Sequence, residues 1–403
     1  MIEIDNPVNK KIALVLDCIG KIIFYSGRFL GLWDIKKNEL TKINPQKILV
    51  IEEEPLGDVI ISIPIFAALK YKFPSARMSV LVSSIGSEIL KNNPYIDEII
   101  VESCPWVYSK QINFSQAINC FRYLKHYQEI SKLLKSKNFD LGIDLRGDIR
   151  NIIFFLFLPK VKYTLSYDRT GGAYLLSKPV FFDASLHIIQ RKINLLKQIG
   201  IEKIDKKIQI YYCREDIKKA EEVFESYGLR KNDFFAIIHP GASQNKRLWS
   251  LNRYAKVADF IKNKYAWYII LTGSKEEAPL TEKIVKLMQN NKVINLCGRL
   301  NISELSILLG KASLLVCPDT SIMHLACISS VPTVAIFGPA DPDITGPCQK
   351  NVYIVKKDYF CKRPCSLSHC KHTKNGISAC MDIISIEEVT NAIDFLLTKI
   401  ERA

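Results

Sequence analysis

A candidate diphosphate site lies where a short apolar run, residues 314–316, gives way to turn and helix-capping residues. The polar and helix-starting side chains there are Asp319, Thr320, Ser321, Ile322 and His324. The first amides of a helix that begins at this point lack internal partners and carry the positive end of the helix dipole, so they could hold a diphosphate. A helix capped in the ordinary way, without a ligand, is the alternative.

A carboxylate that could act as a general base follows the first apolar strand-like run, residues 47–51. Three glutamates and a proline come next, and Gly57 and Asp58 then open an apolar helix over residues 61–71. Glycine lets the backbone approach a ligand closely, and a strand-to-helix loop would direct Asp58 toward a crevice. The spacing is not that of a dinucleotide-binding fingerprint. Taken alone, Asp58 is equally compatible with a helix N-cap.

Strands and helices that alternate along the chain predict a doubly wound α/β protein. The predicted strands are residues 47–51, 77–82, 98–101 and 141–145 in the first half, and 234–238, 267–271, 293–296, 314–316 and 333–337 in the second. Two such series predict two parallel sheets, and 403 residues exceed what one core usually supports. The predicted domains are an N-terminal amphipathic helical extension over 1–44, a Rossmann-like domain over 45–212 and a second one over 213–403.

Composition and charge indicate a globular protein with an anionic partner. Hydrophobic residues make up 48% of the chain and charged residues 24%, values that exclude global disorder. The formal charge of +15 favours an acidic ligand or surface. No basic block interleaved with aromatic residues is present, so we expect no nucleic acid partner. A nucleotide sugar or a phosphorylated lipid surface fits the charge, and part of the lysine excess solvates helix faces.

The N-terminal region contains an apolar stretch, residues 12–33, that is interrupted by charge. Lys10, Asp17, Lys21 and Arg28 fall within roughly 40° of one another on a helix of about 100° per residue. A membrane-spanning helix would place three of these charges in lipid at high cost, whereas a helix in the membrane interface leaves them in water. We therefore predict contact with an anionic membrane surface through residues 10–37. The alternative is that this helix packs on its own protein.

Twelve cysteines are present, and four of them are concentrated near the C-terminus. Cys361, Cys365, Cys370 and Cys380 form a C-x3-C-x4-C-x9-C pattern, which is looser than the paired C-x2-C spacing of common zinc sites. Three states are compatible with it: a structural metal site such as zinc, disulfides, and free thiols in a packed loop. A reducing compartment disfavours the disulfides.

Five stretches in order resemble the ADP-heptose:lipopolysaccharide heptosyltransferases of glycosyltransferase family 9. They are KILVIEEEPLGDVIISIPIFAALKYKFP, FDLGIDLRGDIRN, FAIIHPGASQNKRLWSLNRYAKVADFI, LTGSKEEA and NLCGRLNISELSILLGKASLLVCPDTSIMHLACISSVPTVAIFGPADP. The resemblance implies a GT-B fold, in which two Rossmann-like domains face a cleft. It assigns the acceptor to the N-terminal domain and the nucleotide sugar to the C-terminal one. It also implies that the last helix, residues 386–400, crosses back to the first domain.

The resemblance also implies roles for individual residues. Asp58 would take the proton of the acceptor. The donor would be bound by Lys246, Arg247, Asp319, His324 and the amides of Thr320, Ser321 and Ile322, with Glu276 or its neighbour Glu277 on the ribose. Gly57, Gly241 and Ser243 would line the cleft. Ser321 and Ser250 depart from the usual Gly and Pro of the family, and Arg247 stands where a Lys is common.

On this basis the sequence predicts an inverting glycosyltransferase. It would transfer a heptose or related sugar, from ADP-heptose, to a lipid-linked acceptor of the lipopolysaccharide-core type, without a cofactor for catalysis. The expected location is the cytoplasm, at the inner face of the cytoplasmic membrane. The alternatives are a relative that acts on a capsule or surface glycan with another donor, and a nucleotide-sugar-binding protein without turnover.

Overall fold

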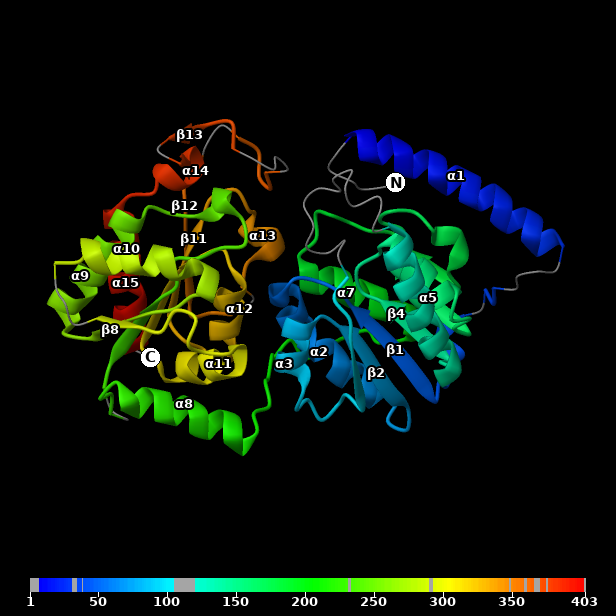
Figure 1. The fold of residues 1–403 in the computed structure, drawn as a ribbon, viewed down its shortest axis with the longest axis horizontal. Helices are drawn as coiled ribbons and strands as arrows, with labels where there is room; N and C mark the ends of the chain where they lie inside the picture. The colour runs from blue at the N-terminus through cyan, green and yellow to red at the C-terminus, as the bar shows by residue number, and fades with distance from the viewer. Residues whose placement is uncertain are drawn as a thin grey trace. The chain divides into compact units, whose positions relative to one another are not determined.

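The computed structural model describes residues 7–30, 35–37, 39–104, 120–230, 233–289, 293–347, 349–358, 361–365, 370–374 and 376–401. The chain forms two compact units, Met1–Lys206 (unit 1) and Lys207–Ala403 (unit 2). Each unit is built around one parallel sheet of six strands with helices packed on it (Figure 1). These two sheets confirm the predicted α/β class.

The sheet of unit 1 has the strand order β3-β2-β1-β4-β5-β6. Its strands are β1 (Lys47–Glu52), β2 (Arg77–Val82), β3 (Glu98–Val101), β4 (Leu141–Asp144), β5 (Tyr163–Tyr167) and β6 (Lys178–Val180). The central strands are apolar and almost wholly buried, as expected of a parallel sheet covered on both faces. The order reverses between β1 and β4, and a crevice opens beyond the carboxyl ends of the strands at such a reversal.

Helices and short turns connect the strands of unit 1. They are α1 (Pro7–Phe29), η1 (Leu40–Lys42), α2 (Leu56–Lys72), α3 (Ser84–Leu90), α5 (Cys120–Lys137), α6 (Ile149–Asn151), η3 (Ile152–Phe157), η4 (Ala173–Leu175), α7 (Ile188–Leu196) and η5 (Lys197–Ile199). Helices α2 and α7 pack against each other. This contact brings residues from opposite ends of the unit 1 sequence to the edge where β1 ends.

Unit 2 repeats the topology with the order β12-β11-β10-β7-β8-β9. Its main strands are β7 (Phe235–Ile238), β8 (Tyr268–Leu271), β9 (Val293–Asn295), β10 (Leu314–Pro318), β11 (Thr333–Phe337) and β12 (Val352–Lys356). Counted from the first strand of each unit, both sheets have the same order, and the reversal in unit 2 lies between β7 and β10. A small antiparallel pair, β13 (Thr373–Lys374) and β14 (Ile377–Ser378), stands apart from the sheet.

The last helix of unit 2 packs differently from what the sequence led us to expect. The helices of this unit are α8 (Arg214–Ser226), η6 (Asn245–Arg247), α9 (Leu251–Tyr265), η7 (Lys275–Glu277), α10 (Ala278–Leu287), α11 (Ile302–Lys311), α12 (Ser321–Ile328), α13 (Pro342–Thr345), α14 (Ala379–Asp382) and α15 (Ile386–Glu401). Val389, Ile393 and Leu396 of α15 are buried in the core of unit 2 together with Trp249. The expectation that this helix crosses back to the first domain is wrong, because its apolar side chains complete the core of unit 2.

Helix α1 packs on unit 1 by a narrow face. Phe24 is 2% exposed and contacts the rings of Phe157 and Tyr174, and Asp17 is buried with its carboxylate accepting a hydrogen bond from the Gly172 amide at 2.8 Å. Lys21 pairs with Asp17 at 2.8 Å. The expectation that the charged stripe is solvated is therefore wrong for Asp17, which is fixed to the protein.

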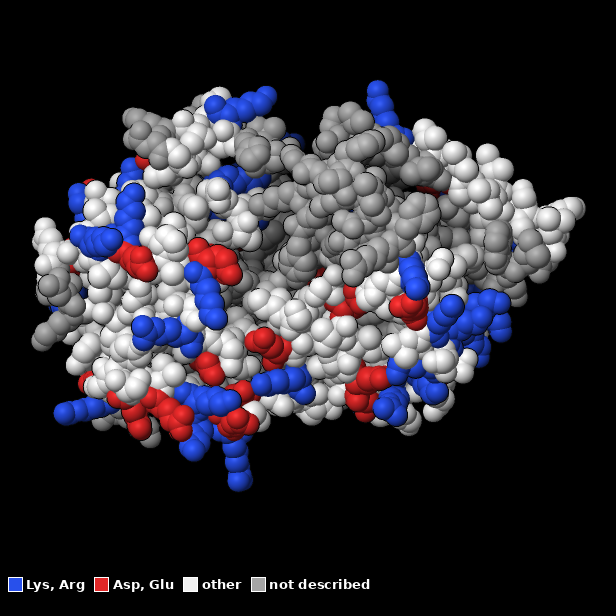
Figure 2. All heavy atoms as spheres, viewed as in Figure 1, with Lys and Arg blue, Asp and Glu red and all other residues white. Residues whose placement is uncertain are grey.

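The opposite face of α1 is apolar and open. Its exposed hydrophobic side chains are Leu14, Val15, Ile19, Ile22, Ile23, Tyr25 and Phe29, with exposed fractions from 45% to 91%. In Figure 2 the surface along this helix is largely free of Lys, Arg, Asp and Glu, whereas charges of both signs are crowded over α8. Among the helices in the described part of the chain, none has the length and apolarity needed to cross a membrane.

Candidate active site

The catalytic candidate Asp58 lies beyond the carboxyl end of β1, in the first turn of α2. The turn is closed by a hydrogen bond from the Asp58 amide to the Pro55 carbonyl at 2.8 Å. The side chain lines a cavity of about 130 Å³ in unit 1, which it shares with residues of the β4 loop and of α7. The position expected from the sequence, a strand-to-helix loop at a crevice, is thus the position found.

The pKa of Asp58 is raised to about 6. Burial of the carboxyl is the main cause, and the negative charge of Glu54 adds to it, against the attraction of Lys192, Arg191 and Arg146. A carboxylate with a pKa near neutrality is ionised at pH 7 and remains basic enough to take a proton. This environment suits a general base.

Lys192 of α7 holds the start of α2 in place, and sequence reasoning missed it. Its ammonium group is buried and donates to both carboxylate oxygens of Glu52 at 3.1 Å, to the Asp58 carbonyl at 3.2 Å and to the Ser62 hydroxyl. Four acceptors around one ammonium fix the end of β1 to the first turn of α2. The signal in the sequence was a single lysine among the apolar residues of the helix at 188–196.

The loop after β4 is held by Asp144. Its buried carboxylate accepts hydrogen bonds from the Gly147 amide at 2.9 Å, from the Asn151 side chain at 3.0 Å and from the Ser166 hydroxyl at 2.7 Å. The loop directs Arg146 to the segment after β1, where it donates to the Glu53 carbonyl at 3.0 Å. The FDLGIDLRGDIRN stretch therefore positions the crevice of unit 1.

In unit 2 the corresponding reversal carries Asp319 and the start of α12. Asp319 is 4% exposed and pairs with Arg247 at 3.0 Å between Oδ2 and Nη1. Burial raises the pKa of Asp319, and the neighbouring guanidinium opposes this shift. Thr320 is the N-cap of α12, and its side chain makes no capping hydrogen bond to any described residue. Ser321 begins the helix as predicted.

Two further donor candidates on α12 are buried rather than open. Ile322 is 5% exposed and His324 is 7% exposed. Because both side chains are buried, a contact of this helix with a ligand would involve its first backbone amides.

The adjacent cations Lys246 and Arg247 of η6 lie in different surroundings. The Lys246 ammonium donates to the Cys365 carbonyl at 2.8 Å, in the cysteine-rich segment. Arg247 reaches the end of β10, where it also donates to the Asp319 carbonyl at 3.4 Å. The sequence left open which of them contacts phosphate, and the geometry favours Arg247.

The two glutamates expected near the ribose, Glu276 and Glu277, differ in their contacts and exposure. Glu277 accepts a hydrogen bond from the Ser274 amide at 2.8 Å, and a Cβ placed on Gly241 would overlap its carboxylate. Glu277 thus lies against the loop after β7, which explains the glycine at 241. Glu276 is exposed, as is Ser243. The geometry favours Glu277 over Glu276 for a contact with a ligand.

His239 directly follows β7 at the same edge. Its Nδ1 lies 3.1 Å from the Thr272 hydroxyl, and burial lowers its pKa to about 4. The imidazole is therefore neutral at pH 7 and adds no positive charge to the edge of unit 2.

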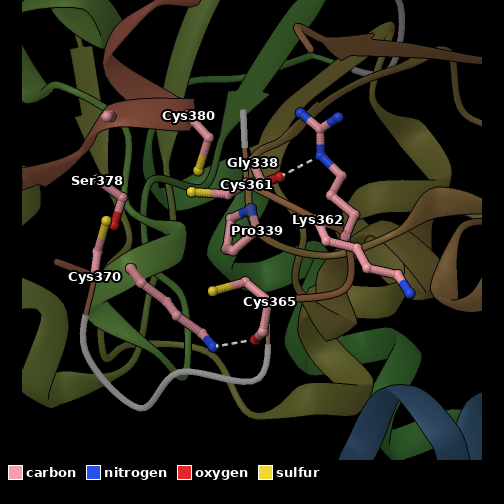
Figure 3. Close-up of a pocket in the computed structure, with 11 residues that line it drawn as sticks. Gly338, Pro339, Cys361, Lys362, Cys365, Cys370, Ser378 and Cys380 are labelled. Carbon is pink, nitrogen blue, oxygen red and sulfur yellow. Dashed lines mark hydrogen bonds between the residues drawn. The ribbon is translucent and has the colours of Figure 1, made fainter. Parts of the chain in front are cut away.

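The four clustered cysteines line one small pocket in unit 2. Cys361, Cys365, Cys370 and Cys380 direct their sulfurs toward it beside Pro339 (Figure 3). Its volume of about 20 Å³ leaves room for about one water molecule. All four are free thiols in the structure. No group of three or more His, Cys, Asp or Glu in the described residues is arranged to hold a metal ion, so the predicted zinc has no support there.

Comparison with known proteins places this geometry in context. The family model described as glycosyltransferase family 9 (heptosyltransferase) matches residues 127–374. Lipopolysaccharide heptosyltransferase 3 of Escherichia coli K12 is 22% identical over 348 residues, which cover 85% of this chain and 95% of that protein.

Solved structures show the same fold. A family 9 glycosyltransferase from Veillonella parvula superimposes with a TM-score of 0.72 at 22% identity, over 90% of this chain and 99% of that one. The E. coli ADP-heptose lipopolysaccharide heptosyltransferase II gives a TM-score of 0.68 at 17% identity, over 88% and 99%. Together with the two six-stranded sheets, these likenesses confirm the predicted GT-B class.

Proposed function

The chain belongs to glycosyltransferase family 9, the heptosyltransferases, and from this premise we propose that it transfers a heptose from ADP-heptose to a saccharide of the lipopolysaccharide-core type, with inversion at the anomeric carbon. The donor is proposed by likeness to the E. coli ADP-heptose lipopolysaccharide heptosyltransferase II. The observation that carries the proposed chemistry is Asp58, a carboxyl with a raised pKa in a cavity at the strand reversal of unit 1.

In the proposed reaction the acceptor hydroxyl attacks the anomeric carbon from the face opposite the diphosphate. Its proton passes to Asp58 as the new C–O bond forms, and the bond from the anomeric carbon to the diphosphate oxygen breaks. The nucleoside diphosphate leaves with that electron pair. Because the carboxylate is already partly desolvated and held by the turn of α2, little reorganisation is needed at the moment of transfer.

Unit 2 supplies the groups proposed to bind the donor. Negative charge grows on the diphosphate as the bond breaks, and the first amides of α12 with the guanidinium of Arg247 would stabilise it. Glu277 would accept hydrogen bonds from the ribose hydroxyls. All of these groups belong to the protein, so the proposed mechanism uses no cofactor.

The test is a transfer assay with ADP-heptose and a lipopolysaccharide-core acceptor, run beside UDP- and GDP-sugars. Asp58→Asn is expected to lower turnover by roughly 10²- to 10⁴-fold, the usual contribution of a positioned base, with donor affinity within a few fold of the wild type. Near-normal turnover of Asp58→Asn would exclude it as the base. Transfer from another nucleotide sugar would support the capsule or surface-glycan alternative, and donor binding without transfer to any acceptor would indicate a binding protein.

We also propose that unit 1 docks on the cytoplasmic face of an anionic membrane through α1. The argument is the open apolar face of α1 together with exposed Lys11, Lys21 and Arg28 on the same helix and Lys36 and Lys37 beyond it. An interfacial helix buries such a face at the lipid headgroups and gains about 1 kcal/mol for each nearby basic residue. A lipid-linked acceptor would then be met at the surface where it resides.

The docking proposal is tested by co-sedimentation with vesicles of phosphatidylcholine and phosphatidylglycerol. Ile22→Glu with Ile23→Glu is expected to abolish binding, and added salt to weaken that of the wild type. Ile217→Glu on α8, an exposed apolar residue of unit 2, is the matched control. Deleting the whole helix is less informative, since Asp17 and Phe24 pack on unit 1. Wild-type protein that stays in the supernatant at low salt would contradict the proposal.

A metal at the four cysteines stays a prediction. It is tested by elemental analysis of protein purified without chelator. One metal ion per chain, lost in Cys361→Ser with Cys370→Ser, would support ligation. Metal-free protein whose melting is unchanged by EDTA would establish packed free thiols.

A further inference from the structure

Helix α1 stands outside the parallel sheet of unit 1, yet a buried charged side chain ties it to that unit. Asp17 is 6% exposed, and its Oδ1 accepts a hydrogen bond from the Gly172 amide at 2.8 Å, 155 positions away in the sequence. Burying a carboxylate is costly, and its hydrogen bonds must offset that cost. Phe24 already anchors the helix by apolar packing, so the buried carboxylate calls for a reason of its own.

Glycines on both partners shape the contact. Gly171 has φ +107°, and a Cβ placed on it would lie 2.8 Å from the Asp17 Oδ1. On α1, a Cβ at Gly20 would overlap the Tyr174 hydroxyl. A side chain at either position would keep the helix and the turn apart. Lys21, about half exposed, pairs with the second carboxylate oxygen of Asp17 at 2.8 Å.

Asp17 holds the loop that follows β5, residues 168–172 (the β5 loop). Arg169 of this loop lines the cavity that contains Asp58. One end of the β5 loop is fixed by the sheet, where β5 ends, and the other end is fixed by the bond from the Gly172 amide to α1. The contact with α1 therefore limits the positions that this wall of the cavity can take.

The β5 loop is joined in turn to the loop after β4. The Thr170 amide donates to the Gly147 carbonyl at 3.2 Å, and the Thr170 hydroxyl oxygen accepts a hydrogen bond from the Ile149 amide at 2.8 Å. The loop after β4 carries Arg146, which donates to the Glu53 carbonyl beyond β1. A continuous series of contacts thus runs from α1 through two loops to the crevice of unit 1.

We propose that Asp17 is a positioning residue of this crevice, through which α1 supports the two loops from behind. Without the carboxylate, the β5 loop would lose the bond that fixes its far end, and the glycines at 171 and 172 would let it move. The loop after β4 would then be held less firmly, and an acceptor hydroxyl would be less well placed toward Asp58. The inference rests on the proposed glycosyl transfer and extends it to a helix outside the sheet.

The first test is amide hydrogen exchange of the full chain, read by mass spectrometry, and it does not depend on turnover. Asp17→Ala is expected to speed exchange of the Gly172 amide about 10- to 100-fold, because it removes a hydrogen bond to a charged group. The amides of Thr170 and Ile149 should also exchange faster, although Asp17 does not bond to them. Faster exchange at Gly172 alone would make Asp17 the cap of a single turn and would overturn the proposal.

Two control variants separate the hydrogen bond from the charge. Asp17→Asn keeps an acceptor oxygen for the Gly172 amide, and Lys21 can turn to water, so exchange should stay close to that of the wild type. Lys21→Gln removes the ion pair, leaves the acceptor in place and should also behave as the wild type. Exchange in Asp17→Asn as fast as in Asp17→Ala would contradict the hydrogen bond as the cause.

A second route to the same effect guards against loss of folding, which thermal melting checks in every variant. Gly20→Ala keeps the Asp17 carboxylate but crowds Tyr174, so it should lift α1 from the turn. It is expected to speed exchange of the Gly172, Thr170 and Ile149 amides less than Asp17→Ala does. Unchanged exchange of all three amides in folded Gly20→Ala would count against the support by α1.

The second test is the kinetics of transfer. Asp17→Ala is expected to lower kcat/KM about 10- to 100-fold, chiefly by raising the KM for the acceptor, because a small misplacement far from the chemistry can have this effect. A variant that is only less stable would instead show a lower kcat at an unchanged acceptor KM. The affinity for ADP, proposed to bind in unit 2, should not change. An acceptor KM equal to that of the wild type would overturn the positioning role.

Failure of the proposed function gives a different pattern. In that case Asp17→Ala still speeds exchange at Gly172, Thr170 and Ile149, and Asp17→Asn still restores it, but neither the wild type nor any variant transfers a heptose.

Discussion

The two units share one strand order and differ in what stands at its reversal. In unit 1 the ends of β1 and β4 carry a dense set of charges. Lys192 pairs with Glu52, Arg146 donates to the Glu53 carbonyl, and Asp144 accepts a hydrogen bond from the Gly147 amide. In unit 2 the ends of β7 and β10 carry one ion pair, Arg247 with Asp319, and a helix start. The topology creates a crevice in both, and the loop residues decide its chemistry.

This difference matches the two halves of the proposed reaction. Deprotonating a hydroxyl requires a carboxylate whose pKa is shifted and whose position is fixed. Burial raises the pKa of Asp58, and Lys192 holds the turn that carries it. Holding a diphosphate requires donors directed at its oxygens, which a helix N-terminus and one arginine provide without a buried network. The predictions below test this division between the units.

The largest expected effect is on stability, at the ion pair of unit 1. Lys192 and Glu52 have side chains 4% and 0% exposed, whereas Arg247 and Asp319 are 24% and 5% exposed. Lys192→Met leaves a buried carboxylate without its partner, so the free energy of unfolding should fall by about 3–5 kcal/mol. Arg247→Met should lower the free energy of unfolding by less, because the guanidinium of Arg247 is partly solvated. Chemical denaturation of both variants measures the difference.

The control for this prediction is the double variant Glu52→Gln with Lys192→Met. Removing both charges should restore part of the lost stability, since the penalty comes from the isolated carboxylate. If Lys192→Met were as stable as the wild type, the buried network would not be what holds the crevice of unit 1.

The second effect concerns donor affinity and should be confined to unit 2. Arg247→Ala is expected to weaken ADP binding by about 1.5–3 kcal/mol, the range for a hydrogen bond to a charged group. Lys246→Ala should change it much less, because that ammonium is bonded to the Cys365 carbonyl. Calorimetric titration with ADP compares the two variants. Equal losses would mean that both cations of η6 face the phosphates.

Much of this division could be predicted from the sequence. Continuous apolar runs located the strands β1, β2 and β11 to within a residue, because buried parallel strands have no polar alternation to obscure them. Asp58 and the start of α12 were found because turn and capping residues directly follow such runs. The strands β5, β6 and β12 were missed, since YTLSY, KPV and VYIVK are short or mix polar residues with apolar ones.

The features of the candidate site that the sequence did not predict depend on contacts between distant segments of the chain. Lys192, 140 residues after Glu52, reads as an ordinary helical lysine until α7 packs on α2. Arg169 and Arg191 look like surface charges, and only the fold brings both to the ring of Phe182. The choice between Lys246 and Arg247 likewise required the side-chain directions, which spacing does not determine.

The third effect is on pH dependence and should arise in unit 1. Asp58 must be ionised to accept a proton, and its pKa is about 6. Below that value kcat/KM should fall about tenfold for each pH unit, and it should level off above about pH 7. His239 of unit 2, with a pKa of about 4, is neutral across this range and should not contribute. A pH profile of kcat/KM measures this dependence. A plateau of kcat/KM that reaches down to pH ~5 would contradict the raised pKa of Asp58.

The smallest expected effect separates the two neighbouring glutamates of unit 2. Glu277 lies against Gly241 and caps η7 through the Ser274 amide, whereas Glu276 is exposed. If Glu277 accepts hydrogen bonds from the ribose, Glu277→Gln should weaken ADP binding by about 0.5–1.5 kcal/mol, since the amide keeps one acceptor oxygen and loses the charge. Binding of inorganic pyrophosphate, which has no ribose, should be unchanged in the same variant. Glu276→Gln is the matched control and should bind ADP as the wild type does. Loss of affinity for both ligands would instead indicate that Glu277 acts by holding the loop after β7, and the ribose contact would have to be sought elsewhere at the edge of unit 2.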